Sequence, residues 1–314
     1  MRFRQLLVTS LLLGACSGVP APISAPAPAP AAEAVSLLGK PLVAPALPPA
    51  LAAERQAQLT AAERELERHP DRVDSWVWAG RRLAYLGRYR EAIEIYTRAL
   101  GRFPGEPHLL RHRGHRFLTV RRLDEAVRDF ERALEQVVGQ PDEIEPDGLP
   151  NAANVPTSSL QGNLWYHLGL ARYLQGDWAA ALAAYREGMK VSTHPDMEMA
   201  TRYWLILTLR RLGLEVEARQ ALAPVRADQE MLESGAYQKL LLVYRGDLDA
   251  DRLLAEARAG SDLDRATVTY GVGLYFQLAG DEARARELFR ELAEGPGWAS
   301  FGALAAEAEL ARGR

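Results

Sequence analysis

A period of about 34 residues constrains the fold of this chain more than any other feature. Pro70 and Pro104 stand 34 residues apart, and after residue 51 apolar residues recur at the helical spacing of about 3.6 residues. Gly213, Gly246 and Gly280 repeat the period at intervals of 33 and 34 residues. Such a period is typical of stacked helical units, because a single unit cannot bury its own apolar face. The sequence therefore predicts an all-α solenoid.

The first complete unit carries large, small and turn residues at fixed positions: Trp76, Gly80, Leu83, Gly87, Ala92, Tyr96, Ala99 and Pro104. This pattern resembles the tetratricopeptide repeat (TPR), a helix–turn–helix unit that stacks into a right-handed superhelix. Ala79 and Leu83 depart from the pattern, in which leucine and tyrosine are usual. The small residues at 80 and 92 would let the two helices approach closely, and Gly87 would end the first helix.

The same phase returns in five further units, which makes six in all. The fifth of the six is degenerate because Asp251 stands where a small residue is expected. The resemblance thus implies a TPR superhelix of about six helix–turn–helix units. Four aspartates are predicted to cap the second helices: Asp124, Asp177, Asp247 and Asp281. The marker residues of the later units include Gly114, Phe117, Phe130, Trp165, Gly169, Tyr185, Leu205, Gly213, Ala218, Gly246, Gly273, Phe276, Ala285 and Phe289.

Both ends of the solenoid are predicted to carry a capping helix. Apolar residues at helical spacing indicate a first helix that begins near Leu51 and ends before Pro70. Residues 299–312 indicate a closing helix, which a solenoid needs to cover its last apolar face. The solenoid is therefore predicted to span residues 51–314, with an insert at 139–160 that interrupts the period.

Residues 1–15 are typical of a secretory signal peptide, since two arginines precede a short apolar run and small residues follow it. Leu13-Gly14-Ala15-Cys16 resembles the lipobox of bacterial lipoproteins, in which the cysteine is lipidated. This resemblance implies a lipid anchor at Cys16. Because Ser17 and not aspartate follows, it implies the outer membrane, facing the periplasm, if the cell is Gram-negative. The alternative is an ordinary secretory signal in which Cys16 is coincidental.

Residues 16–50 are predicted to be a linker that follows the lipidated cysteine. Nine of the 19 prolines lie before residue 51, mixed mainly with alanine. A stretch of this composition is expected to be extended, polyproline-like and unable to bury a core. Its expected role is to hold the solenoid away from the membrane.

Composition excludes several classes of function. With one cysteine in the chain, a disulfide framework and a cysteine-ligated zinc site are excluded. A formal net charge of −3 gives no support for a nucleic-acid partner. The sequence contains no serine-hydrolase elbow, phosphate-binding loop or zinc-protease helix, so we expect neither catalytic residues nor a cofactor.

The segment 108–117 concentrates histidine and arginine on one predicted helix. His108, His112 and His115 share a face of that helix at spacings of four and three residues. One interpretation is a transition-metal site, although Arg111 and its neighbouring arginines oppose a cation there. A second is a binding patch for an external carboxylate or phosphate. A third is an acidic partner within the chain.

The insert at 139–160 is the acidic partner that the chain offers. It contains Asp142, Glu143, Glu145 and Asp147 and no basic residue, and its four prolines disfavour a helix. It can therefore be a permanent latch over the basic helix, a lid that a partner displaces, or a disordered loop.

In this family the first helix of each unit lines the concave groove. The residues expected to face it, and so to bind a partner, are Arg81, Tyr85, His108, Arg111, His115, Asn163, Tyr166, Tyr173, Tyr203, Arg210 and Arg211, continued by Tyr244 and Tyr270. Tyrosine and arginine are the residue types that dominate interface energetics. The carboxylate clamp of chaperone-binding TPR proteins is absent, because Val77 and Arg81 occupy the corresponding positions.

These features predict a cell-envelope lipoprotein that acts as a non-catalytic protein–protein interaction scaffold. Its expected partners are envelope proteins or peptides, together with the membrane through the anchor. The alternative is a ligand- or metal-binding protein, enzymatic or not, that uses the helix 108–117.

Overall fold

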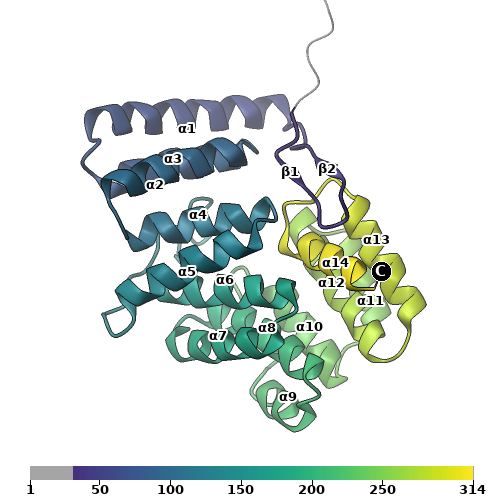
Figure 1. Ribbon diagram of the computed structural model, residues 1–314. Helices are drawn as coiled ribbons and strands as arrows, with labels where there is room; N and C mark the ends of the chain where they lie inside the picture. Colours follow the sequence, from purple (N-terminus) through teal and green to yellow (C-terminus); the bar gives the residue numbers. More distant parts are fainter. Residues whose placement is uncertain (1–30, 314) are drawn as a thin grey trace, which may run out of the picture. The chain divides into compact units, whose positions relative to one another are not determined.

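A computed structural model describes residues 31–313, and the predicted signal peptide, Cys16 and Ser17 lie outside the described residues. Within that range, the chain forms helix pairs in the predicted order, flanked by one helix before them and one after (Figure 1). The first-helix and second-helix pairs are α2 (Val73–Tyr85) with α3 (Tyr89–Arg102), α4 (Pro107–Thr119) with α5 (Leu123–Val137), α6 (Leu160–Gln175) with α7 (Trp178–Val191), α8 (Pro195–Arg211) with α9 (Glu215–Leu222), α10 (Gly235–Arg245) with α11 (Ala250–Arg258), and α12 (Asp262–Leu278) with α13 (Glu282–Glu294).

The flanking helices are α1 (Pro49–Arg68) and α14 (Phe301–Arg312). Both confirm the helices predicted at the ends of the solenoid, and α1 ends before Pro70 as expected. The all-α arrangement of successive helix pairs predicted from the repeat pattern is therefore the observed fold. In the described part of the chain, no helix is both long enough and apolar enough to cross a bilayer.

The two helices of a unit approach closely because a glycine on the first faces an aromatic ring on the second. The Tyr96 ring lies against Gly80, and a side chain at position 80 would overlap it. The same arrangement recurs between Gly114 and Phe130 and in two later units, Gly169 with Tyr185 and Gly273 with Phe289. These aromatic rings are buried, so glycine and aromatic residue together fix the spacing of each pair.

The turn between the two helices of a unit requires a left-handed residue. Glycine supplies it in five units, at Gly87, Gly176, Gly213, Gly246 and Gly280, with φ between 70° and 93°. In the second unit the position is occupied by Arg121, whose φ is 67°. A left-handed conformation costs a residue with a side chain about 1–2 kcal/mol, so Arg121 is a local departure from the repeat pattern.

Two of the four predicted caps are confirmed. The Asp177 and Asp281 side chains accept hydrogen bonds from the first turns of α7 and α13. The other two predictions are wrong: Asp249, and not Asp247, caps α11, and Asp124 accepts from the Gln175 side chain instead of capping α5.

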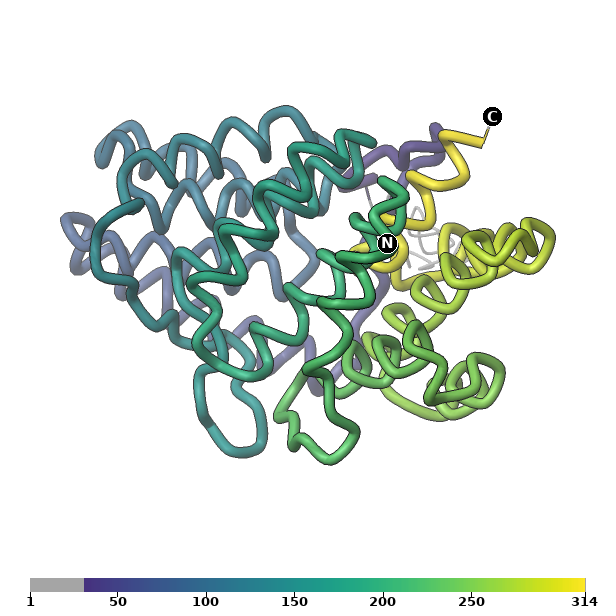
Figure 2. The backbone as a smooth tube through the Cα atoms, turned by 90° about the horizontal axis from the view of Figure 1, so that it is seen from below, coloured from purple at the N-terminus to yellow at the C-terminus, as the bar shows by residue number. Residues whose placement is uncertain are grey.

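The predicted linker is wrong for the segment 33–43, which is folded. Ala34–Val35 (β1) pairs antiparallel with Pro41–Leu42 (β2), and Ala34 and Leu42 are buried. The Trp298 indole donates to the carbonyl of Val43 at 2.7 Å. Figures 1 and 2 show this hairpin beside the C-terminal helices, far away in sequence. The prediction relied on the composition of the whole linker, and a composition averaged in this way does not show a short segment with its own turn and apolar residues.

Candidate functional site

We call the surface formed by α2, α4, α6, α8, α10 and α12 the first-helix surface, since it carries the predicted partner-binding residues. The structure divides these residues into two groups. The insert contacts the predicted residues of α2, His108 and Arg111 of α4, and Asn163 at the start of α6. His115 of α4 packs instead against His167. The remaining residues of α6 and those of α8, α10 and α12 pack against one another or against α14.

The insert pairs with the basic helix α4, as its charge suggested. Arg111 Nε lies 3.0 Å from Glu145 Oε2, and His108 Nε2 lies 3.2 Å from Glu143 Oε2. Glu145 is only 5% exposed, so this ion pair is shielded from water. The interpretation of an acidic partner within the chain is therefore confirmed.

Further hydrogen bonds extend this contact onto the neighbouring helices. Asn163 donates through its side-chain amide to Glu145 and to Ser158 Oγ. Arg81 donates to the carbonyl of Pro146 at 2.8 Å, and its Nε lies 3.3 Å from the Tyr85 hydroxyl. Three first helices therefore hold the same short segment of the insert.

The histidines of α4 do not converge on one site. His108 binds Glu106 and Glu143, whereas His112 stacks near the Tyr96 ring. His115 and His167 lie together, with ring centroids 4.6 Å apart. Between residues 31 and 313, no three His, Cys, Asp or Glu side chains gather in positions that could hold a metal ion.

Burial and charge keep three of these histidines neutral. Burial lowers the pKa of His112 and of His115 well below its usual value, and neighbouring arginines act in the same direction. Burial lowers the pKa of His167 to about 3. His108 behaves oppositely, because its hydrogen bond to Glu106 raises its pKa.

The tyrosines predicted to line an open groove are buried in an aromatic cluster. Trp204 donates through its indole to the Tyr166 hydroxyl at 2.9 Å, and the Tyr173 and Tyr270 hydroxyls are hydrogen-bonded at 3.0 Å. Tyr203 packs edge-on against the Trp204 ring. These side chains lie on first helices, as the repeat phase predicts, but the first helices of later units cover them.

The predicted residue Tyr244 and the two predicted arginines of α8, Arg210 and Arg211, are also engaged within the chain. Tyr244 donates to the carbonyl of Gly271 at 2.9 Å. Arg210 donates to the carbonyl of Tyr244, and Arg211 forms an ion pair with Glu309 of α14 at 2.6 Å. Side chains expected to meet a partner thus stabilise the C-terminal units instead.

A buried ion pair between Arg121 and Glu307 fixes α14, and the sequence did not reveal it. The Arg121 Nε donates to Glu307 Oε2 at 3.1 Å, and the Arg121 side chain is 2% exposed. Its guanidinium also donates to the carbonyl of Trp298 at 2.8 Å. Glu307 additionally accepts from the backbone of Leu37 in the hairpin. The only available signal was an arginine at a turn position where the other units have glycine.

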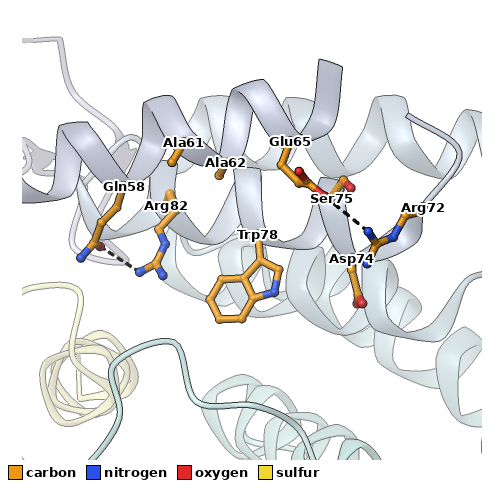
Figure 3. Close-up of a pocket in the computed structure, with 9 residues that line it drawn as sticks. All are labelled: Gln58, Ala61, Ala62, Glu65, Arg72, Asp74, Ser75, Trp78 and Arg82. Atoms are coloured by element: carbon orange, nitrogen blue, oxygen red, sulfur yellow. Dashed lines mark hydrogen bonds and ion pairs between the residues drawn. The ribbon is translucent and has the colours of Figure 1, made fainter. Parts of the chain in front are cut away.

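The N-terminal end of the first-helix surface stays open, and Figure 3 shows a pocket there between α1 and α2. The pocket has a volume of about 390 Å³. Its most prominent side chain is Trp78, which is half-buried and stacks with Arg81 and Arg82 at 4.6 and 5.0 Å from the ring centroid. The Arg82 Nη1 donates to Gln58 Oε1 at 2.9 Å. Trp78 was not predicted from the sequence, because Trp76 and not Trp78 occupies the tryptophan position of the repeat pattern. Trp76 packs in the core.

Comparison with known proteins identifies the repeats. Residues 73–105 and 164–187 match family models described as tetratricopeptide repeat. No curated protein sequence matches the chain.

Similar solved structures include the following two. One is YrrB, a TPR protein with an unusual peptide-binding site, with 16% identity over 80% of this chain and 98% of that chain and a TM-score of 0.41. The other is Naa15/Naa10 bound to HypK-THB, with 17% identity over 76% of this chain and a TM-score of 0.37. The chain spans 34% of the length of that second structure's chain. On the two repeat matches and the order of its helix pairs, the chain contains tetratricopeptide repeats.

Proposed function

We propose that this protein is a non-catalytic scaffold that binds a partner protein at the pocket around Trp78. The observation that carries the proposal is a half-buried tryptophan, stacked with two arginines, in a pocket on a surface whose predicted partner-binding residues mostly contact other parts of the chain. Tryptophan and arginine are the residue types whose truncation costs most at protein interfaces. TPR superhelices use extended concave surfaces to bind their partners.

The proposed location is the cell envelope, with the protein exported and lipidated at Cys16. The support is the lipobox resemblance of residues 13–16 and the proline- and alanine-rich segment that separates Cys16 from the folded unit, which begins at Ala32. Two or more acyl chains give stable anchoring. In a Gram-negative cell the protein would face the periplasm from the outer membrane, and its partner would be another envelope protein.

The test is crosslinking followed by affinity capture from native membranes. We expect the full-length chain to capture a partner that the double variant Trp78→Ala/Arg82→Ala no longer captures. Arg186→Ala is the matched control, because Arg186 is an exposed arginine on the second helix α7. Capture of the same proteins by both the double variant and the control would contradict the proposal.

The anchor is tested separately with Cys16→Ser. We expect the wild-type protein in the membrane fraction and the variant released from it, with the acyl chains visible as added mass on the wild-type protein alone. Equal distribution of the two proteins between membrane and soluble fractions would favour an ordinary secretory signal.

A further inference from the structure

The segment 143–148 of the insert lies on the first-helix surface in the manner of a bound peptide. Its contacts follow one another in chain order across α4, α6 and α2: Glu143 meets His108, Glu145 meets Arg111 and Asn163, and the carbonyls of Pro146 and Gly148 accept from Arg81 and Arg82. The segment is not helical, and Ile144 forms an isolated β-bridge with Ser159. Gly148 lies so close to the Tyr85 hydroxyl that a side chain there would overlap it.

The helices provide a built carboxylate site beneath this segment. Arg111 is nearly buried, and its Nη1 lies 3.0 Å from Nδ1 of His112. Since His112 is neutral, Nδ1 can accept from the guanidinium and hold it in place. Asn163 adds an amide donor that is also buried. A buried arginine needs a counter-charge, and in the described residues Glu145 supplies it.

Polar contacts, and not apolar burial, hold the segment in this site. Ile144 is 62% exposed and Leu149 is 58% exposed. A second chain that offered the same carboxylates and carbonyls would therefore replace the contacts of the segment nearly one for one. The outer part of the insert is tied elsewhere, because Asn151 and Thr157 donate to Glu233, so the segment can leave the surface without releasing the whole loop.

We propose that residues 143–148 occupy, as an internal competitor, a binding site for an extended acidic segment of a partner protein. The site consists of Arg81, Arg111 and Asn163, with His108 at one end and Tyr85 at the other. The proposal rests on the proposed function for the use of the first-helix surface, but it names the part of that surface next to the Trp78 pocket, with Arg81 lying between the two. Residues 143–148 and a segment of a partner protein cannot occupy the site at the same time. The partner segment must therefore displace the insert in order to bind.

The test uses a fluorescent peptide with the sequence of residues 141–150, blocked at both ends, and the full chain. In the unseated variant Glu143→Ala/Glu145→Ala/Gly148→Ala, the insert keeps its length but loses the two carboxylates that meet His108 and Arg111. The new side chain at position 148 also overlaps the Tyr85 hydroxyl. We expect this variant to bind the peptide at least about tenfold more tightly than wild type, since a tethered competitor acts at high effective concentration. Adding Arg111→Ala should abolish the gain, and a peptide with both glutamates replaced by glutamine should not bind.

A second measurement needs no variant and therefore does not depend on its folding. The amides of Glu145 and Leu160 donate to the carbonyls of Ser158 and Glu143. With saturating peptide, we expect both amides of the wild-type chain to exchange hydrogen faster. A folded unseated variant that binds no better than wild type, or peptide binding with unchanged exchange at both amides, would overturn the proposal.

The outcomes also separate this proposal from the proposed function. If membrane capture depends on Trp78 but the peptide does not bind, only the carboxylate site fails. If the peptide binds but partner capture does not depend on Trp78, the proposed function fails and the carboxylate site stands.

Discussion

The two ends of the first-helix surface are built from the same kind of helix but are filled in different ways. Toward the C-terminal units, tyrosine and tryptophan rings pack against one another, and α14 adds buried carboxylates. Toward the N-terminal units, arginines meet a polar loop, and the pocket beside Trp78 stays open. Aromatic side chains on this face can form a core, whereas arginines there need either counter-charges or a partner. The side chains, and not the fold, therefore decide which part of the surface is available for binding.

The largest expected effect is a loss of stability at the C-terminal end of the surface. Replacing Glu307 by alanine leaves the Arg121 charge buried without its partner, and removal of one member of a buried ion pair costs about 3–5 kcal/mol. Glu125→Ala is the matched control, because Glu125 pairs with the exposed Arg122. It should cost at most about 1 kcal/mol. Urea unfolding measures both, and equal losses would show that α14 is not held by this ion pair.

Acid should weaken the protein through its buried histidines. The folded-state pKa of His167 is about 3, below the unfolded value of 6.5. Its contribution is therefore fully present above pH 6.5 and is lost as the pH falls toward 3. At pH 5 the loss is about 2 kcal/mol from His167 alone. His112 and His115 act in the same direction, whereas the raised pKa of His108 acts in the opposite one.

The variant His167→Phe tests this assignment while keeping an aromatic ring beside His115 and Phe301. Unfolding free energies at pH 7 and pH 5 should differ by about 2 kcal/mol less in the variant than in wild type. An unchanged pH dependence would mean that other groups carry the acid sensitivity.

A smaller effect concerns the turn residue Arg121. Both Arg121→Gly and Arg121→Ala remove the ion pair, but only glycine adopts the left-handed conformation without strain. We expect the glycine variant to be more stable than the alanine variant by about 1 kcal/mol in urea unfolding. At the neighbouring Arg122, where φ is −88°, the same two substitutions should not favour glycine. A stability advantage for alanine at position 121 would mean that this turn changes conformation once the ion pair is lost.

The helices and their pairing could be predicted from the sequence because the signals are local. Glycine and an aromatic residue 16 positions later recur in four units, as at Gly80 and Tyr96, and they define the packing of each pair. The contact between the acidic insert and α4 could also be predicted, since the charges are complementary and both segments are unusual. Whether the insert is a latch or a lid remained open, because composition gives no binding energy.

Long-range contacts between elements of ordinary composition could not be predicted. Periodicity shows which face of a helix carries Tyr166 or Tyr203, but it does not show which distant helix covers that face. The hairpin 33–43 meets Trp298 and Glu307 more than 250 residues away, so no local pattern marks it. Arg121 was the one local departure from the repeat that pointed to such a contact.

The smallest expected change in stability tests the open end of the surface. Trp78 is half-buried, and its visible stabilising contacts are those with Arg81 and Arg82, so Trp78→Ala should cost only about 0.5–1 kcal/mol in urea unfolding. The loss for Glu307→Ala is expected to be several times larger. If Trp78→Ala instead costs as much, Trp78 belongs to the core of the N-terminal units, and the contrast between a closed and an open end disappears. A small cost in stability combined with loss of partner capture identifies a side chain that is kept for binding.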